Sequence, residues 1–289
     1  MYPPRLRYVA PKSLDEAFAV MAEYGDDAKV LAGGQSLVPM LKLRFASPAV
    51  LVDINGLSDL AYHRAESDGS LRIGALCRHV DLERSALLPD RYPTMAAAAP
   101  QVADPIVRNR GTVVGSLCHA DPQGDWASVL LALNGQVVVA GKDGRRTISV
   151  ADFVVGPFQN SLAAGEIAVE ASVPAAKGTP YGSYLKLERR VGDFATVGVA
   201  VAIETSGLQI SRAGIALTGV GPNTIQAIEA EQALIGQALE PDVIARAAGL
   251  AAGAARPRSD HRGSAEYKRH VVETFVRRAL SSYRLAVPA

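Results

Sequence analysis

Two glycine-containing segments constrain this chain more than any other feature of its sequence. The first is Ala32-Gly33-Gly34-Gln35-Ser36, and the second is Gly111-Thr112-Val113-Val114-Gly115-Ser116. Glycine allows a positive φ and a close approach of a ligand to the backbone, and converging backbone N–H groups bind a diphosphate. Each segment also ends in a serine hydroxyl. One such segment is typical of an ordinary turn, whereas two in one domain favour a dinucleotide held between two loops.

The common signatures of other redox and catalytic sites are missing from the sequence. Neither G-x-G-x-x-G nor G-x-x-x-x-G-K-[ST] occurs, which disfavours a Rossmann NAD site and a P-loop. Cys77 and Cys118 are the only cysteines, too few for an iron–sulfur cluster, and the five histidines show no metal-ligand spacing. We therefore expect no metal site and no catalytic residues on this chain.

Composition indicates an ordinary globular protein. Hydrophobic residues make up 48% of the 289 residues, enough for two or three compact units, and the formal net charge is +1. This balance, without a dense Lys/Arg stripe, disfavours a nucleic-acid partner. Residues 1–5 lack the apolar core of a signal peptide, and polar residues interrupt the apolar stretches. We therefore expect a cytoplasmic chain with no transmembrane segment.

Periodicity and turn residues predict an α+β fold. Ser13 and Glu16 form a capping box that opens a helix ending near Tyr24. Two β-branched runs, 50–54 and 71–75, are expected to be neighbouring strands of one sheet. The other expected helical segments are 37–44, 81–107, 126–133, 229–236, 241–255 and 265–285, and the other expected strands are 30–31, 137–139, 197–203, 208–210 and 215–217.

A change of composition predicts where the chain divides into domains. Around residues 173–180 the sequence becomes rich in Pro, Gly and small residues. We expect a first domain over 1–176. A second domain over 177–289 is expected to combine a small antiparallel sheet with helices.

Four segments of the chain resemble the medium, flavin-binding subunits of molybdenum hydroxylases. Residues 32–44 resemble the first FAD motif of that family, and residues 111–125 resemble the second. Residues 184–195 resemble the stretch that passes the isoalloxazine ring, and residues 259–268 resemble the family's tail. Their order and spacing are most similar to the medium subunits of aerobic carbon monoxide dehydrogenase. The resemblance implies an FAD-binding fold of the PCMH/VAO type, divided near residue 55 into two α+β subdomains that clasp the FAD. A C-terminal α+β domain follows.

The resemblance also implies which residues hold the cofactor, a non-covalent FAD. Backbone groups of the two motifs are expected to bind its diphosphate, Asp125 to make a polar contact, and Lys186 and Asp193 to lie near the flavin ring. A cation near the ring stabilises the reduced, anionic flavin and raises its reduction potential, whereas a carboxylate lowers it. The implied cofactor-binding residues are Ala32, Gly33, Gly34, Gln35, Ser36, Thr112, Val113, Val114, Gly115, Ser116, Asp125, Lys186 and Asp193.

Two residues depart from the pattern of the family. Gln35 stands where histidine is frequent, which keeps a hydrogen-bonding side chain but removes a group that titrates near neutral pH. Val114 stands where the second motif usually has glycine, and a β-branched residue does not readily adopt a positive φ. The resemblance therefore leaves the backbone geometry around Val114 open.

The resemblance implies an oxidoreductase subunit that passes electrons through FAD to an external acceptor such as a quinone. The electrons come from [2Fe-2S] clusters on a small iron–sulfur subunit, and the molybdenum cofactor lies on a large subunit. The implied assembly is a dimer of heterotrimers, compatible with attachment to the inner face of the membrane.

The same residues fit other functions. The chain could be the medium subunit of a hydroxylase for an N-heterocycle, an aldehyde or an aromatic compound. It could also be a self-sufficient flavoprotein oxidoreductase, or a non-redox module that retains the nucleotide-binding loops.

Overall fold

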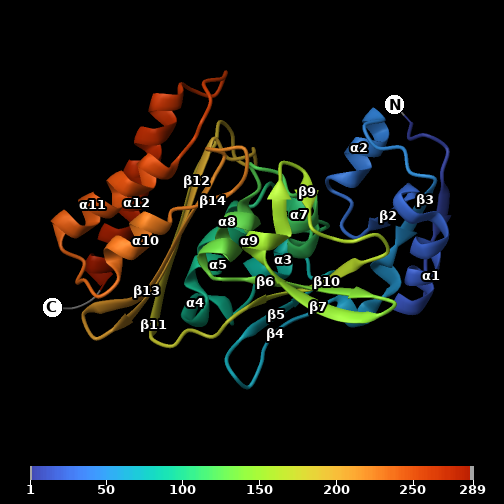
Figure 1. Ribbon diagram of the computed structural model, residues 1–289, viewed down its shortest axis with the longest axis horizontal. Helices are drawn as coiled ribbons and strands as arrows, with labels where there is room; N and C mark the ends of the chain where they lie inside the picture. The colour runs from blue at the N-terminus through green and yellow to red at the C-terminus, as the bar shows by residue number, and fades with distance from the viewer. Residues whose placement is uncertain (1, 287–289) are drawn as a thin grey trace.

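The computed structural model describes residues 2–286, and three units follow one another along its long axis (Figure 1). The first unit is a parallel sheet in the order β1-β3-β2 with two helices. Its elements are β1 (Arg7–Val9), α1 (Leu14–Tyr24), β2 (Ala28–Leu31), α2 (Leu37–Leu43) and β3 (Val50–Asp53), with short 3₁₀ turns at Gly25–Asp27, Ile54–Gly56 and Ser58–Leu60.

The start of α1 follows the expected capping pattern with one shift. Ser13 Oγ accepts a hydrogen bond from the Glu16 N–H at 3.1 Å, as in a capping box. The Glu16 carboxylate, however, accepts from the Lys12 N–H at 2.7 Å rather than from the N-cap residue itself. The helix ends at Gly25, whose φ of 55° is one that glycine adopts without strain.

The second unit is built on a five-stranded antiparallel sheet in the order β4-β5-β10-β6-β7. The expected pairing of 50–54 with 71–75 is wrong, because β3 pairs with β1 and β2, whereas β5 pairs with β4 and β10. Both runs have the pattern of buried strands, and that pattern does not specify a partner.

The strands of the second unit are β4 (His63–Ala65), β5 (Leu71–Gly74), β6 (Gln136–Gly141), β7 (Gly144–Ser149) and β10 (Ile167–Val173), with a separate hairpin of β8 (Val154–Gly156) and β9 (Gln159–Asn160).

Short helices cover this sheet. The segment 81–107, expected to be mainly helical, is a series of short helices because prolines stand at or near the start of four of them. Proline cannot donate the backbone hydrogen bond that a continuing helix requires. The helices are α3 (His79–Glu83), α4 (Leu88–Arg91), α5 (Pro93–Ala98), a 3₁₀ turn at Ala99–Gln101, α6 (Pro105–Arg108), α7 (Val113–His119), α8 (Asp125–Ala132) and α9 (Val150–Phe153).

The third unit is a four-stranded antiparallel sheet in the order β11-β12-β13-β14, with three helices on one face. The two expected strands 208–210 and 215–217 form one continuous strand, β13. The elements are β11 (Thr179–Leu187), β12 (Val197–Ser206), β13 (Gln209–Thr218), β14 (Ile225–Gln226), α10 (Ile228–Leu234), α11 (Pro241–Ala254) and α12 (Ala265–Ala286).

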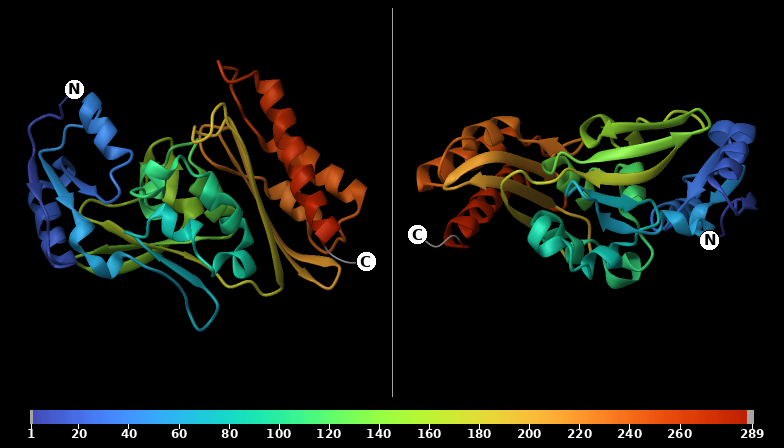
Figure 2. Two further views of the ribbon diagram at one scale, coloured as in Figure 1. Left: turned by 180° about the vertical axis from the view of Figure 1, so that it is seen from behind. Right: turned by 90° about the horizontal axis from the view of Figure 1, so that it is seen from below.

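The sheet of the third unit lies between the C-terminal helices and the middle unit (Figure 2). A hydrophobic core lies on each of its two faces. Alternate residues of β12 point to opposite faces, as the period of a strand requires. Val199 and Val201 pack with the C-terminal helices, whereas Ala200 and Ala202 pack with the core of the preceding units. The small side chains allow close packing on that second face: a Cβ on Gly214 would lie 3.0 Å from the Cα of Ala132 in α8.

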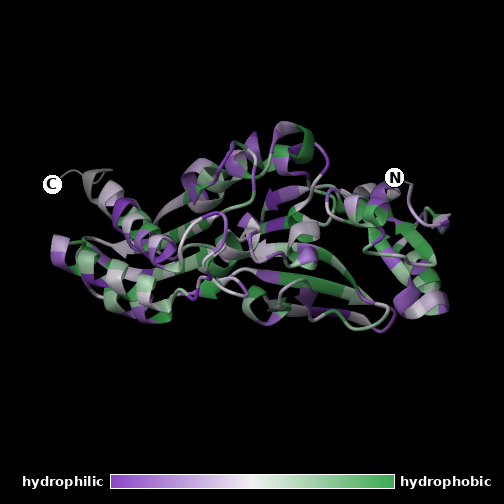
Figure 3. Ribbon diagram, turned by 90° about the horizontal axis from the view of Figure 1, so that it is seen from above, coloured by the Kyte–Doolittle hydropathy of each residue, from purple (hydrophilic) through white to green (hydrophobic). Residues whose placement is uncertain are grey.

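Hydropathy along the chain follows this layering. Figure 3 shows hydrophilic and hydrophobic bands alternating along the C-terminal helices, as expected for helices with one buried face. Within residues 2–286, no helix combines the length and the apolar character needed to cross a membrane.

Candidate functional site

The two glycine-containing segments lie against each other. A Cβ on Gly33 would lie 2.8 Å from the Cα of Gly111 and would overlap the carbonyl oxygen of Arg110. Gly34 has a φ of 75°, which side chains other than glycine rarely adopt. Glycine at 33 therefore allows the two backbones to meet, and glycine at 34 allows the chain to turn between β2 and α2.

The first segment presents polar groups that the protein itself does not use. Within the described part of the chain, the backbone N–H groups of Gly34, Gln35 and Ser36 donate to no acceptor. The Ser36 hydroxyl, at the N-cap position of α2, also makes no capping hydrogen bond. Gln35 reaches back to the Gly33 carbonyl at 3.5 Å, at the limit of a hydrogen bond. Unused donors gathered on one short segment fit an anionic ligand.

The second segment is the start of a helix rather than a loop. Thr112 is the N-cap residue of α7, and its Oγ1 accepts a hydrogen bond from the Gly115 N–H at 3.1 Å. Val114 is the second residue of this helix and is buried, and it is not among the residues with positive φ. A helical backbone suits valine, so the usual glycine of the family is not needed here. Gly115 leaves room for the Thr112 hydroxyl, which a Cβ would approach to 2.7 Å.

Asn55 and Arg78 join the two segments. Asn55 Nδ2 donates to the carbonyl oxygen of Ala32 at 2.8 Å, and Asn55 Oδ1 accepts from Arg78 Nη2 at 2.6 Å. Arg78 Nη1 donates to the carbonyl oxygen of Arg110 at 2.7 Å. Burial is the main reason that the pKa of Arg78 is lowered from its usual value. We call Asn55 and Arg78 the loop clasp. No local sequence pattern identifies these two residues, because their partners Ala32 and Arg110 are distant in the sequence.

His79 supports the second segment from behind. Its backbone N–H donates to the Gly111 carbonyl at 3.0 Å, and a Cβ on Gly111 would lie 2.7 Å from its Nε2. Trp126 Nε1 donates to His79 Nδ1 at 3.0 Å, so the single proton of the neutral ring is on Nε2. Burial lowers the pKa of His79 to about 4, which keeps the ring neutral at neutral pH.

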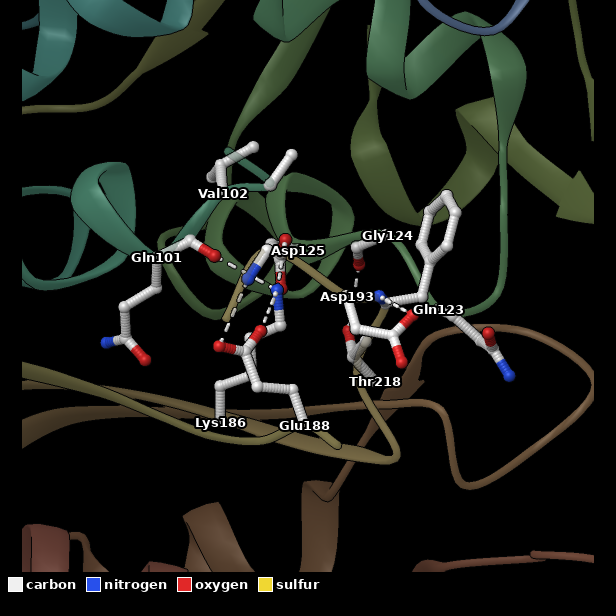
Figure 4. Close-up of polar contacts among 12 residues, drawn as sticks. Gln101, Val102, Gln123, Gly124, Asp125, Lys186, Glu188, Asp193 and Thr218 are labelled. Atoms are coloured by element: carbon white, nitrogen blue, oxygen red, sulfur yellow. Dashed lines mark hydrogen bonds and ion pairs between the residues drawn. The ribbon is translucent and has the colours of Figure 1, made fainter. Parts of the chain in front are cut away.

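Asp125 and Lys186, expected near the cofactor, belong to one buried group of side chains (Figure 4). Lys186 Nζ lies 3.2 Å from Asp125 Oδ2 and 3.4 Å from Glu188 Oε2, and it donates to the carbonyl oxygen of Gln101 at 3.0 Å. The Tyr184 hydroxyl donates to Asp125 Oδ1 at 2.6 Å. Both oxygens of Asp125 are thus engaged within the protein. We call Asp125, Tyr184, Lys186 and Glu188 the lysine cluster.

Asp193 lies outside this cluster. Its Oδ1 accepts from the Phe194 N–H at 2.9 Å and lies 3.4 Å from Arg262 Nη2. Arg262 also donates to the Phe194 carbonyl at 2.8 Å, so the tail expected from the resemblance, 259–268, holds this loop in place. Across residues 2–286, no group of three or more His, Cys, Asp or Glu side chains is arranged to hold a metal ion.

The geometry fits an FAD at the meeting point of the two motifs. A diphosphate needs converging donors and backbone that a ligand can approach closely, and the Gly33–Gly111 contact with the free N–H groups of 34–36 offers both. Of the implied site residues, the structure brings segments 32–36 and 111–116 together. It places Asp125 and Lys186 in one cluster and Asp193 in a different contact.

Two family models together match most of the chain. Residues 4–176 match the family model of the FAD binding domain in molybdopterin dehydrogenase, and residues 182–283 match the CO dehydrogenase flavoprotein C-terminal domain.

Relatives and a solved structure cover nearly the whole chain. The chain is 41% identical to the carbon monoxide dehydrogenase medium chain of Hydrogenophaga pseudoflava, covering 98% of both chains. It is 39% identical to the glyceraldehyde dehydrogenase medium chain of Sulfolobus acidocaldarius, over 96% of this chain and 98% of that relative. The solved carbon monoxide dehydrogenase from Hydrogenophaga pseudoflava that lacks the Mo-pyranopterin moiety matches with a TM-score of 0.92 and 42% identity, over 97% of this chain and 98% of that chain. The chain therefore belongs to the FAD-binding medium subunits of the molybdenum hydroxylase family, and is an oxidoreductase subunit whose own cofactor is FAD.

Proposed function

We propose that this chain is the electron-transfer subunit of a molybdenum hydroxylase and that its FAD diphosphate lies where residues 32–36 and 112–116 meet. The main support for the proposal is the close contact between Gly33 and Gly111, beside the backbone N–H groups of residues 34–36 that donate to no acceptor in the described part of the chain. Bound there, FAD supplies the ability to exchange electrons singly with metal clusters and in pairs with an acceptor. The chain's own residues bind it, orient it and set its charge environment.

Each group of residues has a separate task in this proposal. The N–H groups of Gly34, Gln35 and Ser36 and the Ser36 hydroxyl donate to the phosphate oxygens. The backbone from Ala32 to Gly33 and the start of α7, from Thr112 to Ser116, form the walls of the cradle. The loop clasp holds these walls at a fixed spacing.

The flavin ring is assigned to the side where β11 ends. Lys186 places a buried cation there, and Asp125 offsets its charge from 3.2 Å. Asp193 adds a carboxylate from the following loop, partly balanced by Arg262. The reduction potential of the flavin then depends on the sum of these charges, because charges interact more strongly in a buried site than in water.

The proposed division of the chain follows the two tasks of binding the cofactor and closing over the ring. The FAD-binding domain spans 1–176 with a division near residue 55, and the C-terminal domain spans 177–289. The proposed partners are a large molybdenum-binding subunit and a small subunit with [2Fe-2S] clusters, in a cytoplasmic dimer of heterotrimers. Attachment of this complex to the inner face of the membrane would bring the flavin close to a quinone.

Carbon monoxide is the substrate we propose for the whole complex, through the likeness to the Hydrogenophaga pseudoflava medium chain. An aldehyde is the second candidate, because the Sulfolobus acidocaldarius relative is the medium chain of a glyceraldehyde dehydrogenase and is almost as similar. The substrate is proposed to bind to another subunit, so residues of this chain do not choose between the two.

Stopped-flow reduction tests the proposed role. The purified chain, loaded with FAD, should be reduced by dithionite but should stay oxidised when carbon monoxide or glyceraldehyde is added. Adding the two partner subunits should restore rapid bleaching of the flavin by the correct substrate. Rapid bleaching of the lone chain would instead identify a self-sufficient oxidoreductase, and a purified chain without flavin that takes up none would identify a non-redox module.

A further inference from the structure

The lysine cluster contains more negative than positive charge. It has one cation, Lys186, and two carboxylates, Asp125 and Glu188, so its net charge is −1 when all three are ionised. The Lys186 side chain is only 1% exposed, the Asp125 side chain 7% and the Glu188 side chain 23%. A net charge is costly to keep in such a buried place, because it is shielded from water.

The surroundings supply no further cation. Tyr184 and Lys186 approach Asp125 from β11, and the carbonyl of Gln101 faces Lys186 from the turn before α6. Glu188 receives one long hydrogen bond, from the Gly192 N–H at 3.4 Å to Oε1. Within residues 2–286, no other charged side chain forms an ion pair or a hydrogen bond with Asp125, Lys186 or Glu188.

One oxygen of the cluster is short of a partner. Glu188 Oε2 is buried and accepts no hydrogen bond, and its nearest charged neighbour is Lys186 Nζ at 3.4 Å. A buried oxygen without a donor is stabilised when a proton binds to the carboxyl group. Burial also raises the pKa of the Asp125 carboxyl. Asp125 and Glu188 share the single ammonium group of Lys186, so one added proton on the pair would relieve the excess negative charge.

We propose that the lysine cluster takes up one proton from solvent when the flavin is reduced. This inference rests on the proposed function, which assigns the flavin ring to the end of β11. Added negative charge on a neighbouring flavin makes the net −1 charge of the cluster more costly, and one proton on the carboxylate pair removes it. The cluster is then a proton store linked to the redox state of the cofactor.

The proposed proton uptake balances in electrons and protons. Two electrons reach the flavin from reduced iron–sulfur clusters, or from dithionite in a test, and one proton from solvent binds to the flavin. A second proton from solvent binds to the Asp125–Glu188 pair and neutralises one carboxylate. When two electrons leave to the acceptor, both protons return to solvent. Reduction therefore involves two electrons and two protons, of which the protein holds one.

Replacing Glu188 by glutamine tests the proposal because it removes the excess charge and keeps the shape of the side chain. The measurement is the midpoint potential of the FAD-loaded chain at several pH values. A tenfold change in an equilibrium constant is about 30 mV for a two-electron couple, so each proton taken up contributes about 30 mV per pH unit. The wild-type slope should exceed the Glu188→Gln slope by about this amount. Glu229→Gln, an exposed carboxylate on α10, should keep the wild-type slope.

A second measurement reports on the carboxyl group itself. The infrared difference spectrum between reduced and oxidised protein should contain the C=O band of a newly protonated carboxyl, and the band should be missing in Glu188→Gln. The absorption spectrum of the reduced flavin should be the same in both proteins, which excludes a change in the protonation of the flavin. Equal slopes and no carboxyl band in the wild type, with FAD bound normally, would overturn the proton store alone. Failure to bind FAD at all would overturn the proposed function instead.

Discussion

Gly33 is the residue on which the meeting of the two FAD motifs depends most. A single methyl group at this position would collide with the backbone of Arg110 and Gly111, which cannot move without displacing the start of α7. We expect Gly33→Ala to weaken FAD binding by at least about tenfold, or about 1.4 kcal/mol, while the fold stays formed. Equilibrium binding of FAD to the apoprotein measures the effect, and circular dichroism checks the fold.

Gly249 provides the matched control for this change. It lies in α11, and a Cβ there would have nothing within 4 Å. Gly249→Ala should leave FAD binding unchanged and should stabilise the helix by up to about 1 kcal/mol. If both alanine variants bind FAD as the wild type does, the Gly33–Gly111 contact is not part of the cradle.

His79 should make the stability of the protein depend on pH in a specific window. Its pKa is about 4 in the folded protein, below its usual value of 6.5, because it is buried. The unfolded chain therefore binds more protons between these two values. The stabilisation is fully present above pH 6.5 and is lost as the pH falls towards 4, with a total of about 3 kcal/mol.

Urea unfolding at pH 7, 5.5 and 4.5 measures this contribution. His79→Gln should show a smaller loss of unfolding free energy between pH 7 and 4.5, because glutamine does not titrate but can still accept from Trp126. An unchanged pH dependence in this variant would mean that other groups cause the acid destabilisation.

At the level of residues, the sequence predicted the two glycine motifs but not the side chains that support them. Adjacent glycines followed by serine are visible as a local pattern. Asn55, Arg78 and His79 act through partners that are far away in sequence, such as Ala32, Arg110 and Trp126. Composition and periodicity contain no information on such pairs, so these residues could be found only from the fold.

Among the structural elements, the loop clasp connects the parallel sheet of the first unit to the start of α7. Arg78→Met removes the donor to the Arg110 carbonyl and the donor to Asn55 Oδ1 while keeping the aliphatic stem. A hydrogen bond to a charged group contributes about 1.5–3 kcal/mol, and solvent reduces this for the half-buried Arg78. We expect FAD affinity to fall by about tenfold or more, because the two motifs are no longer held at a fixed spacing.

Arg64→Met is the control for the loop clasp. Arg64 pairs with Glu66 at 2.8 Å, but its side chain is 58% exposed, and exposed ion pairs contribute little. Fluorescence titration of the apoprotein with FAD should separate the two variants. Equal affinities would show that the two units keep their spacing without Arg78.

The order of the elements was largely predictable, and their pairing was not. The helix beginning at Leu14 and the strand, glycine segment and helix around residues 28–43 follow local signals that the structure keeps. β3 pairs with β1 and β2. Strand pairing depends on contacts between segments that are distant in the sequence, and no local pattern encodes such contacts. The segment 111–116 was expected to be a loop, but only Gly111 precedes the N-cap Thr112, whereas Gly115 occupies a helical position in the first turn of α7.

For the whole molecule, the position of the C-terminal sheet would determine, in the proposed function, where a partner subunit can approach the flavin. The sheet closes one side of the cofactor domain through tight contacts such as Gly214 on Ala132. The loop after β11 leaves the sheet beside α6, and Gly192 of this loop packs on Ala103 and Asp104. The loop also contains Asp193, which the proposed function places near the flavin ring. The exposed surface around this loop is therefore where we expect electrons to pass between the flavin and a partner.

Two strongly exposed apolar side chains lie in the loop after β11 and in α6. Val191 is 94% exposed in the loop, and Ile106 is 78% exposed in α6, which follows directly on Ala103 and Asp104, where Gly192 of the loop packs. Exposed apolar side chains can mark interaction sites. In the proposed function, the small iron–sulfur subunit would cover them, because its cluster would have to lie close to the flavin ring for electrons to pass.

The double variant Ile106→Asp/Val191→Asp tests this interface. It should bind FAD normally and be reduced normally by dithionite, but its affinity for the purified iron–sulfur subunit should fall by at least about tenfold, since a charge would be buried against an apolar partner. Leu208→Asp is the control, because Leu208 is 77% exposed between β12 and β13, away from the loop after β11. Surface plasmon resonance with the isolated subunits gives the two affinities. If the double variant and the control bind the partner equally well, electrons leave or enter through another face of the molecule.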